Sequence, residues 1–282
     1  MSVRFSVVIP TRDRNDLLAR CLHQLAPSSQ RLPASEYEVI VTDDSPHETA
    51  RAMVAEHFPW ARWVAGPRRG PAANRNRGAR AGTGELVVFV DDDCLPEPGL
   101  LAGYTAALRD SVPVYEGRTT CRAGATSPLH TAPENLNGGQ LWSCNFAIRR
   151  ATFTAVNGFD ERFPLPHMED ADLRERLRMV AQTIVFVPAA TVDHPPRRLP
   201  WGARLARMHQ ATVLYMVLHP PARSLGWFLQ NELRAKLSRI VHRRKSLDSL
   251  VALSSLPVEL ATIALNWQRW MRWARDAAGA GR

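Results

Sequence analysis

Apolar runs alternate with amphipathic stretches along the first two thirds of the chain. Runs rich in β-branched and aromatic residues predict strands at residues 5–11, 36–45, 61–66 and 85–93. Apolar residues at helical spacing predict helices at 14–25 and 48–58, with helical stretches in the Gly- and Arg-rich segment 71–84. Strands that alternate with helices in this way are typical of an α/β fold with a parallel, doubly wound sheet.

The pattern changes near residue 111. Residues 111–140 are rich in turn-forming and small residues, which predicts loops and an edge strand. Residues 168–180 return to helical spacing with acids in the opening turn, and residues 183–196 read as a strand that ends at two prolines. The segment beyond residue 197 has a mostly helical pattern.

Polar clusters follow three of the predicted strands, at residues 11–14 (TRDR), 43–45 (DDS) and 91–93 (DDD). Because doubly wound sheets bind ligands beyond the carboxyl ends of their strands, we expect these clusters to meet in one crevice. Three adjacent acids at the end of a buried strand repel one another, so they need a bound cation or raised pKa values. A solvated acidic loop that caps the next helix is the alternative.

Charge is distributed unevenly along the 282 residues. The formal net charge is +9, yet residues 197–282 alone hold fifteen basic and four acidic side chains. The preceding residues are slightly acidic. This shift predicts an α/β domain at 1–196 and a basic, tryptophan-rich, mainly helical extension at 197–282.

The N-terminus and the cysteines bear on the location of the protein. The opening residues MSVRFSVVIP run directly into the first predicted strand, so a cleaved secretion signal is not expected. The four cysteines are scattered without a CxxC pair, which is typical of reduced thiols and not of a zinc site or a disulfide framework. We expect a cytoplasmic protein, with peripheral attachment at the inner face of the membrane left open.

Five motifs follow one another in a characteristic order: VVIPTRDR, VIVTDDS, ANRNRGARAGTGELVVFVDDD, NFAIRRATFTAVNGFDERF and EDADLRERL. With them, residues 5–196 resemble the inverting, nucleotide-sugar-dependent glycosyltransferases of family 2, which have the GT-A fold. The resemblance implies a GT-A-type, Rossmann-like, mostly parallel sheet flanked by helices. It also implies transfer of a sugar from a nucleoside-diphosphate-sugar to an acceptor hydroxyl on a saccharide, a lipid-linked compound or a natural product.

The resemblance assigns donor-binding roles to residues from four segments. Thr11, Asp43 and Asp44 match positions that hold the base and ribose of the nucleotide. Arg75, in the segment RNRG, matches an arginine that faces the diphosphate. Asp92 lies between the two acids of the DxD motif and is placed with the donor.

The resemblance also implies a metal site and a base. Asp91 and Asp93 match the DxD motif, whose last carboxylate binds Mg²⁺ or Mn²⁺ and whose first approaches the ribose. His194 matches a histidine that completes the metal shell in some relatives. Glu169 and Asp170 match the ED motif, in which the aspartate is the usual catalytic base. A divalent ion would offset the repulsion among the adjacent acids.

Structural explanations remain open for these residues. Asp43 and Asp44 could form an Asx-turn before Pro46, and Arg75 could be a solvated helix residue. The pair 169–170 could simply favour the helix dipole, and Thr11 could merely follow a strand. His194 could be a hydrogen-bonded loop residue.

The segment 143–150 also has two interpretations. Its Asn145, together with Trp142 and Phe159, could line the acceptor side of the crevice. Alternatively, the segment could be an ordinary core strand.

Two other functions compete with glycosyl transfer. A phosphatase resembling the haloacid-dehalogenase class also places Asp-x-Asp after a buried strand, but it normally has Thr where this chain has Leu95. Moreover, the first lysine of this chain, Lys236, comes too late to serve as the usual phosphate-binding lysine. A non-catalytic nucleotide-sugar-binding scaffold predicts loss of the DxD or ED acids, and both pairs are present.

The basic extension suggests contact with other molecules. It contains five of the eight tryptophans, among them Trp267, Trp270 and Trp273 interleaved with arginines, and a basic cluster at 234–245. This composition suits a membrane interface, while packing on a domain or a homodimer is the alternative. Pro257 and Glu259 argue against a spanning helix, and no recognised motif supports nucleic-acid binding.

Overall fold

The computed structural model describes residues 3–221, 223–242 and 247–279. The chain divides into two compact units. The first comprises Met1–Arg122, Pro133–Pro164 and Glu169–Pro195, and the second comprises Ala123–Ala132, Leu165–Met168 and Pro196–Arg282. Two short segments from the α/β part of the sequence therefore group with the C-terminal helices, a feature that linear composition does not reveal.

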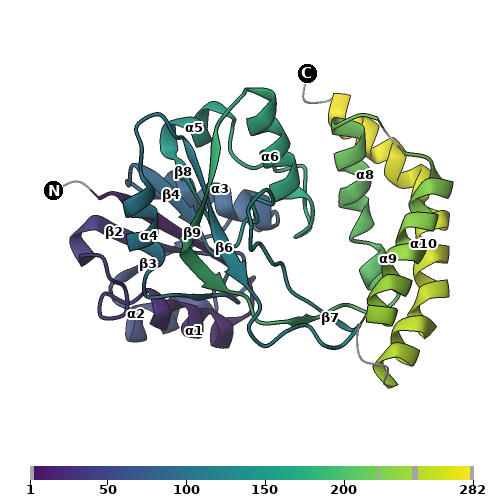
Figure 1. Cartoon of the computed structure of the whole chain (residues 1–282), viewed down its shortest axis with the longest axis horizontal. Coiled ribbons are helices and arrows are strands. Elements are labelled where there is room, and N and C mark those ends of the chain that lie inside the picture. The colour runs from purple at the N-terminus through teal and green to yellow at the C-terminus, as the bar shows by residue number, and fades with distance from the viewer. Residues whose placement is uncertain (1–2, 222, 243–246, 280–282) are drawn as a thin grey trace. The chain divides into compact units, whose positions relative to one another are not determined.

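An eight-stranded sheet forms the centre of the first unit (Figure 1). Its spatial order is β3 (Ala61–Ala65), β2 (Tyr37–Asp43), β1 (Phe5–Thr11), β4 (Leu86–Phe89), β8 (Phe146–Arg149), β6 (Val114–Thr120), β9 (Ile184–Asp193) and β5 (Leu95–Pro96). The first four strands are parallel to one another, and β6 is parallel to β9. Strand β8 runs antiparallel between β4 and β6, and β5 runs antiparallel to β9. The sheet is thus mostly parallel.

Residues 111–140 contain two strands: β7 (His130–Thr131) belongs to a two-stranded sheet with β10 (Arg197–Arg198), as an edge strand would, whereas β6 lies inside the large sheet between β8 and β9. Strand β6 has polar residues although it lies inside the sheet. The buried Glu116 carboxylate accepts hydrogen bonds from the backbone N–H groups of Gly139, Gln140 and Leu141. These long-range bonds allow a charged residue on an inner strand.

Helices cover both faces of the sheet. Side chains alternate along β1, so that Val7 and Ile9 join one apolar cluster and Val8 joins the other. The first cluster includes residues of α1 (Asn15–Leu25), α2 (Ala50–His57) and α4 (Leu100–Ala107). The second includes residues of α3 (Pro71–Ala81), α5 (Arg150–Ala155) and α6 (Glu169–Met179). A short 3₁₀ helix, η1 (Ala34–Glu36), precedes β2.

Helix α3 is one continuous helix where the sequence indicated only helical stretches. It begins with a proline at its first position, after Gly70 at a φ of 98° that suits glycine. A Cβ atom at Gly78 would lie 2.3 Å from a Val8 methyl group. Glycine therefore lets α3 approach the sheet closely, and this approach positions Arg75 above the strand ends.

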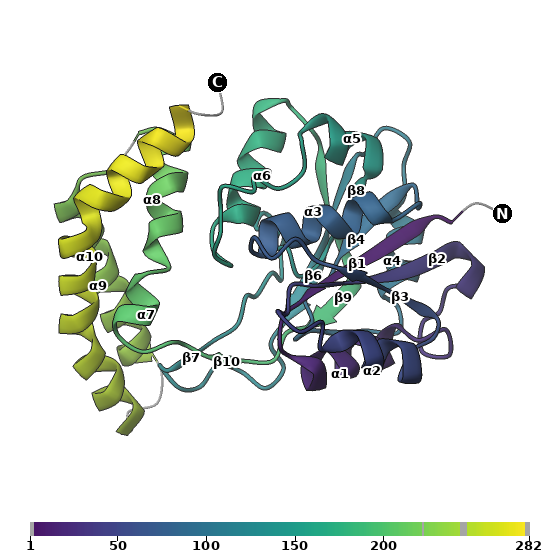
Figure 2. The same cartoon turned by 180° about the vertical axis from the view of Figure 1, so that it is seen from behind.

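The second unit is mainly helical. Its helices are α7 (Ala203–Ala206), α8 (His209–Leu218), α9 (Leu225–His242) and α10 (Leu247–Gly279), and β7 (His130–Thr131) pairs with β10 (Arg197–Arg198). Figure 2 shows α8, α9 and α10 lying side by side. The basic cluster expected at 234–245 is described only as far as His242, and residues 243–245 lie outside the described residues.

Helix α10 continues through Pro257 and Glu259, the two residues that argued against a spanning helix. Pro257 lies on the exposed side, where water can replace the hydrogen bond that proline forgoes. Glu259 is buried and pairs with Lys236. By length and composition alone α10 could cross a membrane, a criterion that core helices of soluble proteins also meet.

Candidate functional site

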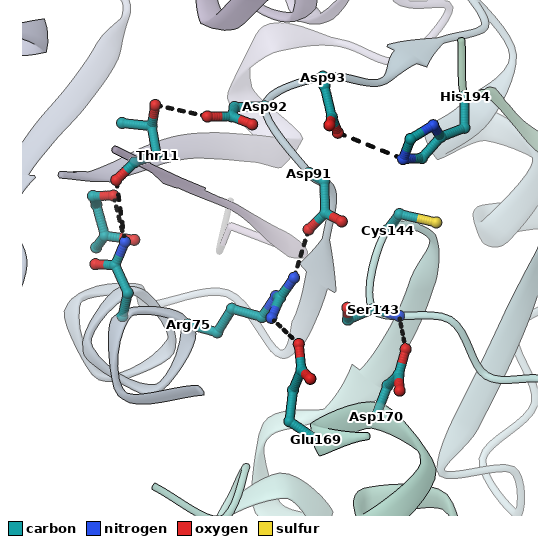
Figure 3. Close-up of polar contacts among 12 residues, drawn as sticks. Thr11, Arg75, Asp91, Asp92, Asp93, Ser143, Cys144, Glu169, Asp170 and His194 are labelled. Carbon is teal, nitrogen blue, oxygen red and sulfur yellow. Dashed lines mark hydrogen bonds and ion pairs between the residues drawn. The ribbon is translucent and has the colours of Figure 1, made fainter. Parts of the chain in front are cut away.

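The three polar clusters meet at the carboxyl ends of β1, β2 and β4, as the alternating pattern predicted. The Thr11 hydroxyl donates to Asp92 Oδ2 at 2.7 Å (Figure 3). The backbone N–H of Asp44 donates to the Thr11 carbonyl at 2.9 Å, and that of Asp13 donates to the Ser45 hydroxyl at 2.8 Å. Parallel strands thereby bring residues that lie far apart in the sequence to one edge of the sheet.

The Asp43 and Asp44 carboxylates are held by backbone N–H groups. Asp43 Oδ1 accepts from the N–H of Ser45 at 2.8 Å, which is the Asx-turn that the sequence left open. Asp44 accepts from the N–H groups of Arg68 at 2.8 Å and Gly70 at 3.2 Å. Burial raises the pKa of Asp44 despite these bonds. Both acids therefore shape the loops around the crevice, and their contact with a nucleotide stays a prediction.

Arg75 joins two of the predicted motifs. Its guanidinium group lies 2.6 Å from Asp91 Oδ1 and 2.9 Å from Glu169 Oε1, as Figure 3 shows. It also lies 5.5 Å from the centre of the Phe159 ring. Although burial opposes its charge, the carboxylates of Asp91 and Glu169 raise the pKa of Arg75. Arg75 is therefore a buried link between the DxD and ED motifs, and the solvated-helix interpretation is wrong.

Arg14 bridges the other two acids of the DDD cluster. Its guanidinium nitrogens lie 3.0 Å from Asp92 Oδ1 and 3.0 Å from Asp93 Oδ2. Burial raises the pKa of Asp92 to about 7, although the Arg14 charge opposes this shift. Arg14 was not among the residues predicted for the site, and only its place in the TRDR cluster after the first strand pointed to it.

Asp93, Cys94 and His194 form a candidate metal centre. One ligand atom from each lies within 4.8 Å of the others. The Pro195 carbonyl can only accept, so His194 Nδ1 carries the proton that it donates at 2.9 Å. When the imidazole is neutral, the lone pair of Nε2 faces Asp93 Oδ1 at 3.4 Å. Two acceptors at this separation need a proton or a cation between them, so the residues fit a divalent metal.

Two points of this centre differ from the sequence analysis. His194 is a buried hydrogen-bonded residue and also faces Asp93, so its two interpretations are compatible. Cys94 was not predicted at the site. Its position directly after the DDD cluster, at the turn that leads into β5, is the sequence feature that could have indicated it.

The ED motif opens helix α6. Asp170 Oδ1 accepts from the N–H of Ala171 at 2.7 Å, and Oδ2 accepts from that of Ser143 at 3.5 Å (Figure 3). Burial raises the pKa of Asp170, and it raises that of Glu169 to about 7 although Arg75 opposes the shift. Glu169 Oε2 is buried without a hydrogen-bond partner among the described residues. The site therefore combines a carboxylate bound to Arg75 with an adjacent one able to act as a base.

Two of the residues considered for the acceptor side, Asn145 and Phe159, have structural contacts. Asn145 accepts from the Tyr104 hydroxyl at 2.7 Å and donates to the carbonyls of Arg118 and Ala190. Phe159 packs in the aromatic cluster of the second apolar core. The segment 143–150 contains β8, so its core-strand interpretation is the one that the structure supports.

Comparison with known proteins identifies the family. The model of glycosyl transferase family 2 matches residues 6–153. The chain is 26% identical over 259 residues to validoxylamine A glucosyltransferase of Streptomyces hygroscopicus subsp. limoneus, covering 76% of this chain and 54% of that protein. It is 31% identical over 163 residues to N-acetylglucosaminyl-diphospho-decaprenol L-rhamnosyltransferase of Mycobacterium tuberculosis, covering 54% of this chain and 50% of that protein.

The chain thus spans about half the length of these curated relatives. Its fold is similar to that of a mannosyltransferase from Pyrobaculum calidifontis solved with GDP-Man and Mn²⁺, with a TM-score of 0.56 and 18% sequence identity. That comparison covers 100% of this chain and 80% of the other. The fold is therefore of the GT-A type. Because the family model matches more than half of the chain, the protein belongs to glycosyl transferase family 2.

Proposed function

We propose that this protein is a glycosyltransferase that moves a sugar from a nucleoside-diphosphate-sugar to an acceptor hydroxyl, with inversion and with a divalent metal. The observation that carries the proposal is the bridge that Arg75 makes between Asp91 and Glu169. It connects the acids that follow β4 to the acids that open α6. A donor site beside one pair and a base in the other would then lie within one crevice.

Asp93 and His194 would hold the metal, either Mg²⁺ or Mn²⁺, with Asp91 nearby at the donor ribose. The arrangement of the His194 lone pair and the Asp93 carboxylate supports this assignment. When bound, the metal supplies positive charge to the departing diphosphate. Arg14 and Arg75 would add positive charge on the same side, because both guanidinium groups already contact the DDD acids.

The nucleoside would bind near Thr11, Asp43 and Asp44, at the ends of β1 and β2. Asp92 would order Thr11 through the hydrogen bond between them. The backbone bonds of Asp43 and Asp44 support a role in shaping this pocket as well as any contact with the base and ribose.

Asp170 would take the proton from the acceptor hydroxyl as that oxygen attacks the anomeric carbon. Its raised pKa suits a base that works near neutral pH. Glu169 is less suited, because one of its oxygens is bound to Arg75. We propose a single in-line displacement, in which the nucleoside diphosphate leaves from the face opposite the attacking oxygen.

The acceptor is proposed only as a class. The two relatives are named for different acceptors, validoxylamine A in one case and N-acetylglucosaminyl-diphospho-decaprenol in the other. A hydroxyl-bearing saccharide, lipid-linked compound or natural product is therefore the acceptor class that we propose. The cytoplasm is the proposed location, because nucleotide sugars would be available to the enzyme there.

Calorimetric titration with UDP, GDP and dTDP, with and without Mn²⁺, tests the proposal. We expect one nucleotide to bind only with metal, and Asp93→Ala to abolish that binding. Asp110→Ala serves as the matched control, since Asp110 is a fully exposed aspartate of the same unit. Absence of nucleotide binding in a folded sample, with or without metal, would contradict the proposed donor site.

A further inference from the structure

Helix α10 has two different faces. On one side Ile263, Trp267 and Trp270 are buried in the second unit, and the Trp267 ring lies 5.4 Å from that of Phe228 on α9. Glu259 on the same side is bound to Lys236. This packing occupies one side of α10 along much of its length.

The opposite side carries an exposed apolar stripe, which we call the outer face of α10: Leu247, Leu250, Val251, Val258 and Leu265. Leu247, Leu250 and Leu265 are 79%, 63% and 84% exposed. The intervals of three, four and seven residues place the five side chains on one side of the helix. At the rise of an α-helix the stripe is about 27 Å long. Contiguous apolar surface of this kind marks interaction sites, because its exposure to water is unfavourable.

The outer face becomes basic at its C-terminal end. Arg269 and Arg272 continue the same spacing beyond Leu265 and are followed by Asp276, and all three are exposed. Residues 197–282 hold fifteen basic and four acidic side chains. An anionic surface complements this charge, whereas a second copy of the same face would set Arg269 and Arg272 against arginines in a parallel pair and against leucines in an antiparallel pair.

We propose that the outer face of α10 docks on a bilayer surface that contains anionic lipid. The leucine and valine side chains enter the boundary between headgroups and acyl chains, and Arg269 and Arg272 contact lipid phosphates. The helix lies in the plane of the surface and does not span the bilayer, because its other side packs on α9 and includes the ion pair of Glu259 with Lys236. This docking is independent of the proposed catalytic role.

Co-sedimentation with vesicles tests the proposal. We expect the whole protein to sediment with vesicles of phosphatidylcholine and phosphatidylglycerol, and not with phosphatidylcholine alone. The double variant Leu250→Glu, Leu265→Glu should lower the partition coefficient about tenfold or more. Arg269→Gln and Arg272→Gln should each lower it about fivefold, an effect that salt should mimic. Met179→Glu is the matched control, because Met179 is 78% exposed on α6 of the first unit.

Each remaining outcome overturns the proposal. Failure to sediment with anionic vesicles removes the docking surface altogether. Unchanged binding of the double variant, with circular dichroism showing a folded chain, places the contact elsewhere. Sedimentation equilibrium without vesicles can instead be used to detect a dimer. If the protein is a dimer and Leu265→Glu converts it to a monomer, the outer face of α10 binds a second copy of the chain. Protein that stays with the vesicles after alkaline carbonate extraction indicates a spanning helix instead.

Discussion

Each unit contains a buried ion cluster, and the two clusters differ in charge balance. In the second unit Lys236 pairs with Glu259, and the Ser255 hydroxyl contacts both side chains. One base therefore meets one acid. In the first unit four carboxylates, the three of the DDD cluster and that of Glu169, contact only two guanidinium groups, those of Arg14 and Arg75.

The difference distinguishes a charge-balanced cluster from one with an excess of acids. A balanced buried pair needs nothing further, and its net contribution to stability is small because desolvation opposes the attraction. Burial raises the pKa values of Asp92 and Glu169, each to about 7, and the neighbouring carboxylates add to this shift. Such a cluster can bind an additional cation, which is the property that metal-dependent transfer of a sugar would require.

The largest expected effect concerns the acid-rich cluster. Asp170→Asn should lower kcat about 10²–10⁴-fold, because the amide cannot take the proton of the acceptor hydroxyl. Metal-dependent nucleotide binding should persist, as calorimetry would show. Glu175→Gln on the same helix is the control. A variant that keeps most of its rate would contradict the assignment of Asp170 as the base.

In the balanced cluster, removal of one partner should destabilise the second unit. Lys236→Met leaves Glu259 buried without its counter-charge, and we expect a loss of about 3–5 kcal/mol in the free energy of unfolding. The double variant Lys236→Met, Glu259→Leu should recover most of that loss. Urea denaturation of the whole chain measures both, and nucleotide binding should be unchanged. If the double variant is no more stable than the single one, the loss does not come from the uncompensated charge of Glu259.

The pH dependence of stability should distinguish the clusters through Glu169. Burial raises the pKa of this group from 4.5 to about 7, so the folded chain holds the proton more tightly than the unfolded chain. The free energy of unfolding should therefore fall as the pH rises from about 4.5 to about 7. Glu169→Gln removes this contribution. The difference in unfolding free energy between the wild type and the variant should change across that window, and a constant difference would contradict the raised pKa.

The smallest expected effect concerns Arg14. Its guanidinium group competes with any metal for Asp93, so Arg14→Gln should raise the affinity for Mn²⁺ roughly three- to tenfold in the absence of nucleotide. Arg12→Gln, at an exposed arginine beside Asp13, should leave the affinity unchanged. Calorimetric titration of Mn²⁺ measures the change. Weaker metal binding by Arg14→Gln would show that Arg14 supports the metal site instead of competing for it.

Local pattern predicted several elements well and others poorly. Strand β1 has the expected bounds and helix α1 begins one residue later than expected, because an apolar run and a helical spacing are properties of a few neighbouring residues. The inner position of β6 was not predicted, since Glu116 is buried only through bonds to a distant loop. Pro257 does not interrupt α10, because proline on the exposed side of a packed helix is tolerated.

By itself, the sequence determined the α/β alternation, the convergence of three polar clusters at the strand ends and the family motifs. These follow from periodicity and from the polarity of parallel strands, both of which are local rules. Only the tertiary structure decided that Arg75 joins Asp91 to Glu169, that Arg14 lies on Asp92 and Asp93, and that His194 faces Asp93. Such pairings depend on distances between residues far apart in the chain, and no local pattern encodes them.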